Sequence, residues 1–161
     1  MINKNILRRT MRLAGRGGLF AGIFLAAALI ANAPLAQAND HASHGDSASD
    51  QGKIVHVLKA TYDNAQNPLQ IDPVVTDKEF AIAGWVQGGQ GGRALMRKKA
   101  DGTWFIMLCS GDFLRSTETL HKVGVPHEEA ARLAEHLAKA EANMPAERLA
   151  KFASFEGMVM V

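Results

Sequence analysis

The sequence contains a single cysteine, Cys109, so the chain cannot form an internal disulfide bond. It also lacks a Cys-x-x-Cys pair and a His-Glu-x-x-His motif, and the spacing of His127 and His136 puts them on opposite sides of one expected helix. These absences argue against a classical zinc site. Because no disulfide is possible, the core has to be held by burial of apolar side chains alone.

No acidic residue precedes Asp40, and the first 38 residues have the anatomy of a secretory signal peptide. A basic segment ends at Gly18, a nearly continuous apolar run covers residues 19–30, and Ala36-Gln37-Ala38 supplies the small residues that a signal peptidase accepts. We therefore predict export of the protein, with cleavage after Ala38.

A retained membrane anchor is the alternative interpretation of the apolar run, which approaches the length that spans a bilayer. Asn32 and Pro34 interrupt it, and no stop-transfer cluster of charges follows. We therefore expect no stable anchor after cleavage. The pair Arg8-Arg9 leaves open whether export is general or uses a twin-arginine signal.

Residues 39–161 carry all 16 acidic residues but only 13 of the 18 lysines and arginines, which gives the exported part a net charge of about −3. Their 123 positions are enough for one domain. The basic residues are scattered, apart from Arg97-Lys98-Lys99 at an expected strand end. Nucleic acid is therefore excluded as an expected partner, because binding it requires a clustered basic surface.

A polar composition rich in Asp, Ser, Ala and His predicts a flexible, His-containing leader over 39–50. Hydrophobic periodicity predicts one α+β domain over 51–161. Apolar residues recur at helical spacing from Ile54, with Ser49 or Asp50 as a cap, so a first helix should end near Ala65. An antiparallel meander should follow, because residues 74–109 read as strands separated by turn residues. The strand segments are "VVT", "EFAIAGWVQ", "GRALMRKK" and "TWFIMLC".

Helical patterns return after the meander. The expected helices are "FLRSTETLHKVG", "VPHEEAARLAEHLAKAEANM" and "PAERLAKFA", and "SFEGMVMV" should form a final short strand. In the longest helix the buried stripe should be Ala130, Leu133, Leu137 and Ala140, with its glutamates, Glu141 among them, on a solvated face. The arrangement resembles a cystatin-like or nuclear-transport-factor-like cone, a fold that hosts many functions.

The glycine-rich segment "GGQGG" at 88–92 has two interpretations. A phosphate-binding loop would need a helix after it, with backbone amides facing the anion. Here a strand pattern follows, and no Lys-Ser or Lys-Thr pair closes the motif. We therefore predict a turn between two strands.

Cleavage after Ala38 would place a histidine third from a free amine, in the order Asn39-Asp40-His41. The α-amine, two backbone amide nitrogens and the imidazole of His41 then form the tetragonal nitrogen set that Cu(II) and Ni(II) prefer. His44 and Asp46 could support an axial position. We predict a Cu(II) site here, with a polar tract that binds nothing as the alternative.

A second candidate site is sulfur-rich. Strand alternation predicts that Met107 and Cys109 share one face of "WFIMLC", and that Met158 and Met160 share one face of the last strand. Met96 would join them if its strand lies beside Met107. Thioether and thiol ligands favour Cu(I). The alternative is that the methionines and Cys109 simply fill the core.

The position of Cys109 before "SGD" also bears on its reactivity. If Asp112 caps the next helix, the positive end of that helix would favour a thiolate. A catalytic cysteine would further need a histidine base, from among His56, His121, His127 and His136. The sequence selects none of these, so we predict a non-enzymatic protein.

Three segments together resemble a known family: "EFAIAGWVQGGQGGRALMRKKADGTWFIMLCSGDFL", "VGVPHEEAARLAEHLAKAE" and "FASFEGMVMV". They are similar to small periplasmic bacterial proteins described as copper uptake system-associated, and the resemblance covers 55–161. It implies a periplasmic location and a role in copper acquisition, beside copper chaperones and copper-enzyme assembly factors. The family pattern assigns no catalytic residue.

The expected function is therefore a copper-handling protein that binds, buffers or passes copper to such partners. Cu(II) would bind at Asn39, Asp40, His41 and His44, and Cu(I) at Cys109 with Met107, Met158 and Met160. The alternative is a metal-free module that binds a small apolar ligand or a partner protein. Trp85, Trp104 and Phe105 would then line its binding surface.

Overall fold

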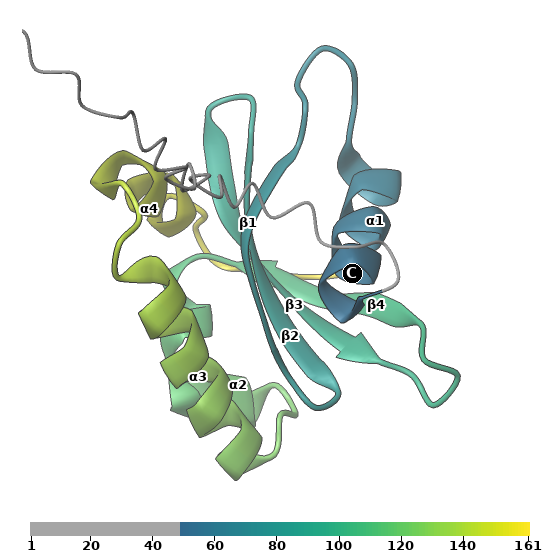
Figure 1. Cartoon of the computed structure of the whole chain (residues 1–161). Coiled ribbons are helices and arrows are strands. Elements are labelled where there is room, and N and C mark those ends of the chain that lie inside the picture. Colours follow the sequence, from purple (N-terminus) through teal and green to yellow (C-terminus); the bar gives the residue numbers. More distant parts are fainter. Residues whose placement is uncertain (1–48) are drawn as a thin grey trace, which may run out of the picture. The chain divides into compact units, whose positions relative to one another are not determined.

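A five-stranded antiparallel sheet organises residues 49–161, the part of the chain that this computed structural model describes (Figure 1). The strands lie side by side in the order of the sequence. They are β1 (Gln70–Asp77), β2 (Phe80–Gln87), β3 (Gln90–Lys98), β4 (Trp104–Ser110) and β5 (Met158–Met160). The predicted α+β class, the meander and the final short strand are thus confirmed, while the resemblance to a cone stays a prediction.

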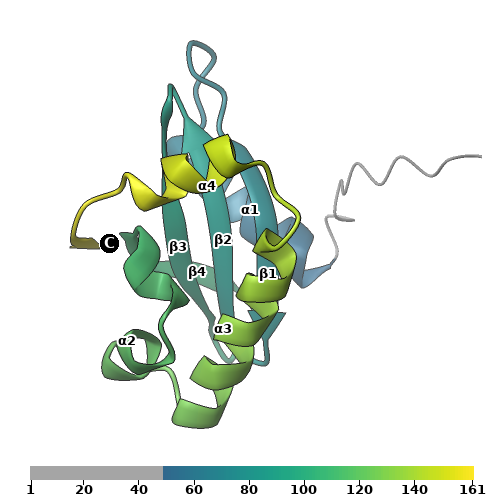
Figure 2. The ribbon, with the colours of Figure 1, turned by 90° about the vertical axis from the view of Figure 1, so that its left-hand side faces the viewer.

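Helices cover both faces of the sheet (Figure 2). Helix α1 (Asp50–Tyr62) packs on one face, and the other carries the 3₁₀ helix η1 (Asp112–Arg115), α2 (Thr117–Lys122), α3 (His127–Glu141) and α4 (Ala146–Ala153). Within residues 49–161 no helix has the length and apolar character needed to cross a membrane.

Helix α1 starts where the sequence predicts it. The Ser49 hydroxyl accepts a hydrogen bond from the Gly52 amide at 3.1 Å, which satisfies one of the free N–H groups of the first turn. Asp50, which the sequence assigned to the leader, is the first helical residue. Its carboxylate accepts bonds from Lys98 Nζ at 2.7 Å and Trp104 Nε1 at 3.2 Å, so the start of α1 is tied to the sheet.

The helix ends at Tyr62, three residues before the expected end at Ala65. Asp63 adopts an extended backbone, and its carboxylate accepts a hydrogen bond from the Leu69 amide at 2.7 Å. This bond closes the loop that leads into β1, and it competes with continuation of the helix.

The "GGQGG" segment is a turn, as predicted. Gly88 and Gly89 have φ angles of +57° and +87°, which favour glycine, and they connect β2 to β3. Gly92, further along in β3, serves packing: a Cβ there would lie 2.9 Å from Cζ2 of Trp85. The Trp85 ring can therefore lie directly against the β3 backbone.

Each face of the sheet has its own core. Ile82, Leu95 and Leu108 pack against α2 and α3 on one face, where Leu133 and Leu137 are fully buried as the helical pattern predicts. On the other face a second set packs against α1; it includes Ile54, Leu58, Ala83, Ala94, Met96, Trp104, Ile106 and Cys109. Burial of these apolar side chains stabilises the sandwich without any disulfide.

Glu141 is buried, which corrects the expectation of a solvated glutamate. Its side chain is 3% exposed and accepts two bonds from the guanidinium of Arg93, at 2.7 and 2.9 Å; Arg93 is 1% exposed. The pair joins β3 to the end of α3. A charge of this kind is buried only when a partner of opposite charge faces it, and the sequence pattern of α3 alone does not reveal that partner.

Asp112 does not cap a helix as expected. Its carboxylate accepts a bond from Nη1 of Arg93 at 3.0 Å, and Gly111 is the residue that precedes η1. The single helix expected over "FLRSTETLHKVG" is divided in two, because the Ser116 hydroxyl accepts a bond from the Thr119 amide and starts α2 anew.

Candidate functional site

A β-bulge in β4 changes which side chains lie together. Leu95 of β3 pairs with Leu108, but its neighbour Met96 pairs with Ile106, so Met107 is an extra residue between them. Met107 packs with the α2 and α3 core, whereas Cys109 belongs to the α1 core. The prediction that Met107 and Cys109 share a face is therefore wrong, because the extra residue interrupts the alternation.

Strand β5 also separates the sulfur atoms. Val159 is the residue paired with Cys109, and Met158 and Met160 pair with Ser110 and Leu108. Directly paired residues of an antiparallel ladder project to the same face, so Val159 accompanies Cys109 and the two methionines project to the other side. The set of Cys109, Met107, Met158 and Met160 predicted for Cu(I) is not assembled.

Met96 shares the α1 face with Cys109, although its backbone pairs with Ile106 and not with Met107. Its side chain is fully buried, as expected of a methionine that fills the core. Within the described residues no three His, Cys, Asp or Glu side chains come together as a metal site. Residues 39–44, which hold the predicted Cu(II) ligands Asn39, Asp40, His41 and His44, lie outside the described part.

The histidines of α2 and α3 lie across the sheet from Cys109. His121 and His136 belong to α2 and α3, on the opposite side of the sheet, where their Nδ1 atoms contact the backbone carbonyls of Val125 and Thr76. His127 stacks edge-on against His121, with ring centroids 5.6 Å apart. A cysteine nucleophile activated by one of these three histidines therefore finds no support in the geometry.

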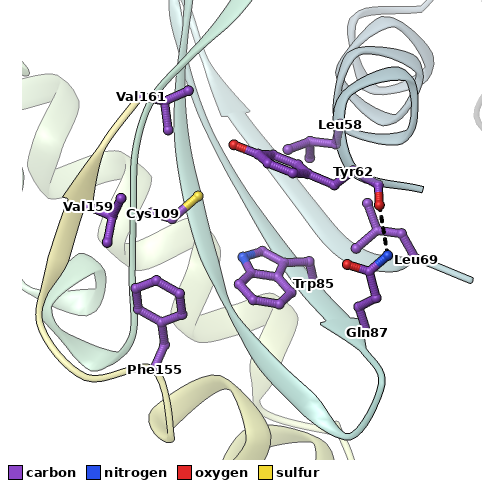
Figure 3. Close-up of a pocket in the computed structure, with 9 residues that line it drawn as sticks. All are labelled: Leu58, Tyr62, Leu69, Trp85, Gln87, Cys109, Phe155, Val159 and Val161. Atoms are coloured by element: carbon purple, nitrogen blue, oxygen red, sulfur yellow. Dashed lines mark hydrogen bonds between the residues drawn. The ribbon is translucent and has the colours of Figure 1, made fainter. Parts of the chain in front are cut away.

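A cavity of about 210 Å³ lies between α1, the sheet and the C-terminal segment (Figure 3). Leu58 and Tyr62 of α1, Leu69 before β1, and Trp85 and Gln87 of β2 form one part of its wall. Cys109 of β4, Phe155, Val159 and Val161 form the rest. The wall is mostly apolar and holds a few polar atoms, which is typical of small-molecule sites.

Gln87 fixes the rim of the cavity. Its side-chain amide nitrogen donates bonds to the carbonyl oxygens of Tyr62 and Asn67, both at 2.8 Å, so the end of α1 and the following loop are attached to β2. These bonds hold Tyr62 in place, and its ring projects over the cavity toward Val161 in Figure 3.

The thiol of Cys109 points into this cavity and is 8% exposed. Burial raises its pKa above the ordinary value, which contradicts the expectation of a thiolate favoured by a nearby helix. Burial also raises the pKa of Tyr62, and the charge that Cys109 would carry raises it further. Both groups therefore remain protonated at neutral pH.

Trp85 contributes a buried nitrogen to the wall. Its Nε1 is buried and has no hydrogen-bond partner among the residues that the structure describes, and in Figure 3 this nitrogen faces the cavity. The ring is held from two sides, by Gly92 and by an edge-to-face contact with Phe155, with centroids 5.8 Å apart. The indole N–H is thus a fixed donor to which residues 49–161 offer no acceptor.

Of the three aromatic residues predicted to line a binding surface, only Trp85 does so among the residues around the cavity. Trp104 uses its Nε1 to bind Asp50, and Lys98 lies over its ring. Phe105 lies under Lys99 at the far end of β4.

Sequence reasoning did not find Tyr62, Leu69, Gln87 or the two C-terminal valines as neighbours. Val159 and Val161 alternate with the two methionines of the tail, and this alternation indicates that the valines share one face of the last strand. Which of the two sets faces the domain depends on the pairing register with β4.

Searches of protein-family models, curated proteins and solved structures found no match to this chain. Inferences about its function therefore depend on its own residues.

Proposed function

We propose that the protein is an exported copper-handling protein with two separate parts. The N-terminal leader binds copper, and the folded domain is a metal-free binding module that uses the cavity under α1. The observation behind this division is the arrangement of the sulfur atoms: the thiol of Cys109 faces the cavity, while Met107 packs in the opposite core and Met158 and Met160 project to that side.

Two features of the sequence support copper handling in the periplasm. The pattern of residues 55–161 resembles the copper uptake system-associated proteins, and the predicted cut after Ala38 creates the Asn39-Asp40-His41 terminus. The amine, amides and imidazole of that terminus match the tetragonal preference of Cu(II), with His44 close in sequence. In this proposal copper chaperones or copper-enzyme assembly factors receive or deliver the metal.

The cavity supports the role of the domain. It is walled mainly by Leu58, Leu69, Phe155 and Val159, which offer no metal ligand, and its thiol is kept protonated by burial. A protonated thiol is a poor metal ligand, since metals bind the thiolate. The site is therefore better suited to an apolar group than to a copper ion.

Copper titration of the exported protein tests the proposal, after its intact mass has located the cleavage site. We expect His41→Ala to weaken Cu(II) binding by at least about tenfold, or about 1.4 kcal/mol. His56→Ala is the matched control, because His56 is an exposed histidine on α1. Equal Cu(II) affinity of wild type and His41→Ala would contradict the leader site.

A second titration tests the domain with Cu(I). The double variant Met158→Leu, Met160→Leu should bind Cu(I) as the wild type does, because these side chains project away from Cys109. A clear loss of Cu(I) affinity in this variant would show that the methionines bind copper together, and it would refute the metal-free module.

A further inference from the structure

We infer that the cavity under α1 is a binding site for a small, largely apolar molecule that carries one hydrogen-bond acceptor, and that the indole N–H of Trp85 donates to this acceptor. This inference rests on the proposed binding-module function of the domain, and it does not depend on copper binding by the leader. It adds the chemical class of the ligand and the residue that recognises it.

The first argument is the free donor. Buried polar groups in proteins are nearly always hydrogen-bonded, and an indole nitrogen can only donate. The contrast within this chain is direct: Trp104 Nε1 donates to Asp50 at 3.2 Å, whereas Trp85 Nε1 is buried at the cavity and has no partner in the described part of the chain. A ligand oxygen or nitrogen in the cavity would satisfy it.

The second argument is that the cavity wall does not suit water. A buried water molecule needs about two to four polar partners. Most of the wall is carbon, from side chains such as Leu58, Phe155 and Val159, and the thiol of Cys109 is a weak hydrogen-bonding group. The other polar side chains of the wall are Tyr62 and Gln87, and the Gln87 amide nitrogen already donates to two backbone carbonyls. A molecule that presents one acceptor to Trp85 and carbon to the apolar majority of the wall fits this distribution better than a group of water molecules.

The third argument is size and access. An engineered cavity of about 150 Å³ binds benzene, so about 210 Å³ accommodates roughly eight to ten non-hydrogen atoms. Tyr62 and Val161 are exposed to 39% and 64% and face each other across the cavity in Figure 3, so they mark its entrance. An aryl ketone has the matching size and a single acceptor oxygen.

The rigidity of the donor makes it selective. Gly92 lets the Trp85 ring lie against β3, and Phe155 contacts the ring edge-on. These two contacts fix the orientation of the ring, and therefore the direction in which its N–H points. A molecule of the same shape without an acceptor would leave the donor buried and unsatisfied, and it would therefore bind less well.

Two probes of nearly equal shape test this inference: acetophenone, which has a carbonyl oxygen, and α-methylstyrene, which has a methylene group in its place. Binding is measured by NMR titration of the exported protein. The chain has two tryptophans, so the spectrum contains two indole N–H signals. We expect acetophenone to shift the Trp85 indole signal strongly, α-methylstyrene to shift it little, and neither to move the Trp104 indole signal.

Variants add an affinity comparison. In the wild type, acetophenone should bind about tenfold more tightly than α-methylstyrene, which is the amount expected for one hydrogen bond to a buried donor. In Trp85→Phe this preference should disappear, so that the two probes bind with similar dissociation constants. Trp104→Phe is the matched control and should leave the preference unchanged. If Trp85→Phe fails to fold, the indole signals of the wild type decide the question alone.

The outcomes separate the two levels of the proposal. If neither probe shifts the backbone signals of Leu58 and Cys109 at its solubility limit, both the binding module and this inference are refuted. If both probes bind but shift the Trp85 indole signal equally, the binding module is supported and the acceptor preference is refuted. A selective shift of the Trp85 indole supports both, and none of these results depends on whether the leader binds copper.

Discussion

Cys109 and Met107 lie on opposite faces of the sheet although only Leu108 stands between them. In a regular strand residues two apart share a face. Met107 is the extra residue of a β-bulge. The side chain of Cys109 therefore projects to the face opposite the one that a regular strand would give it. This single extra residue places the thiol in the cavity under α1 and away from the methionine.

The bulge predicts an unusual tolerance to deletion. Removing Met107 should regularise the pairing of β3 with β4 and leave Ile106, Leu108 and Cys109 on their present faces. We expect a loss of no more than about 2 kcal/mol in unfolding free energy, from the lost packing of one partly buried methionine. Urea unfolding measures the loss, and alkylation of Cys109 reports whether the thiol stays shielded.

Deletion of Phe105 is the matched control. It shortens the regular part of β4 and moves Trp104 out of register with Lys98, so the buried indole should leave the core at a loss of about 3–5 kcal/mol. If the two deletions destabilise the protein equally, Met107 is not the residue that the strand can omit.

The raised pKa of Cys109 makes stability depend on alkaline pH. The folded state holds the thiol proton more tightly than the unfolded state, so this contribution is present below the ordinary thiol pKa of about 9 and is lost as pH rises above it. We expect the melting temperature to fall between pH 8 and pH 10 more steeply in wild type than in Cys109→Ala. Parallel curves for the two proteins would contradict a shielded thiol.

The ion pair of Arg93 and Glu141 should be the most sensitive polar contact of the domain. Glu141→Gln replaces the buried carboxylate beside the guanidinium, 1% exposed, with a neutral amide and leaves the half-exposed carboxylate of Asp112 as its remaining charged partner. We expect a loss of about 3 kcal/mol in unfolding free energy, the lower end of the range for breaking a buried pair, because Asp112 still compensates part of the charge. Glu135→Gln on the exposed side of the same helix removes the pair with Lys139 and should have almost no effect. Comparable losses for both would show that burial of the pair is unimportant.

Gly92 should control the position of the Trp85 ring. A Cβ at this position would lie 2.9 Å and 3.1 Å from two atoms of the indole, so Gly92→Ala has to displace the ring. We expect a changed Trp85 indole N–H signal and weaker binding of acetophenone. Gly102→Ala is the control: with φ at +83° it is strained, but no atom lies near the added Cβ. It should lower stability without moving the Trp85 signal.

The sequence by itself determined the elements of the folded domain. Period-two patterns identified the meander, Ser49 marked the start of α1, and the stripe with Leu133 and Leu137 identified the buried face of α3. These features follow from interactions between residues close along the chain, and local patterns report such interactions directly.

Only the tertiary structure decided what those elements place together. The bulge at Met107, the register of Val159 beside Cys109, and the burial of Glu141 each depend on a partner far away in the sequence. The cavity arises in the same way, because its wall combines α1, β2, β4 and the C-terminal segment. A pattern along one strand shows that two residues alternate, but pairing with other segments determines which face meets which neighbour.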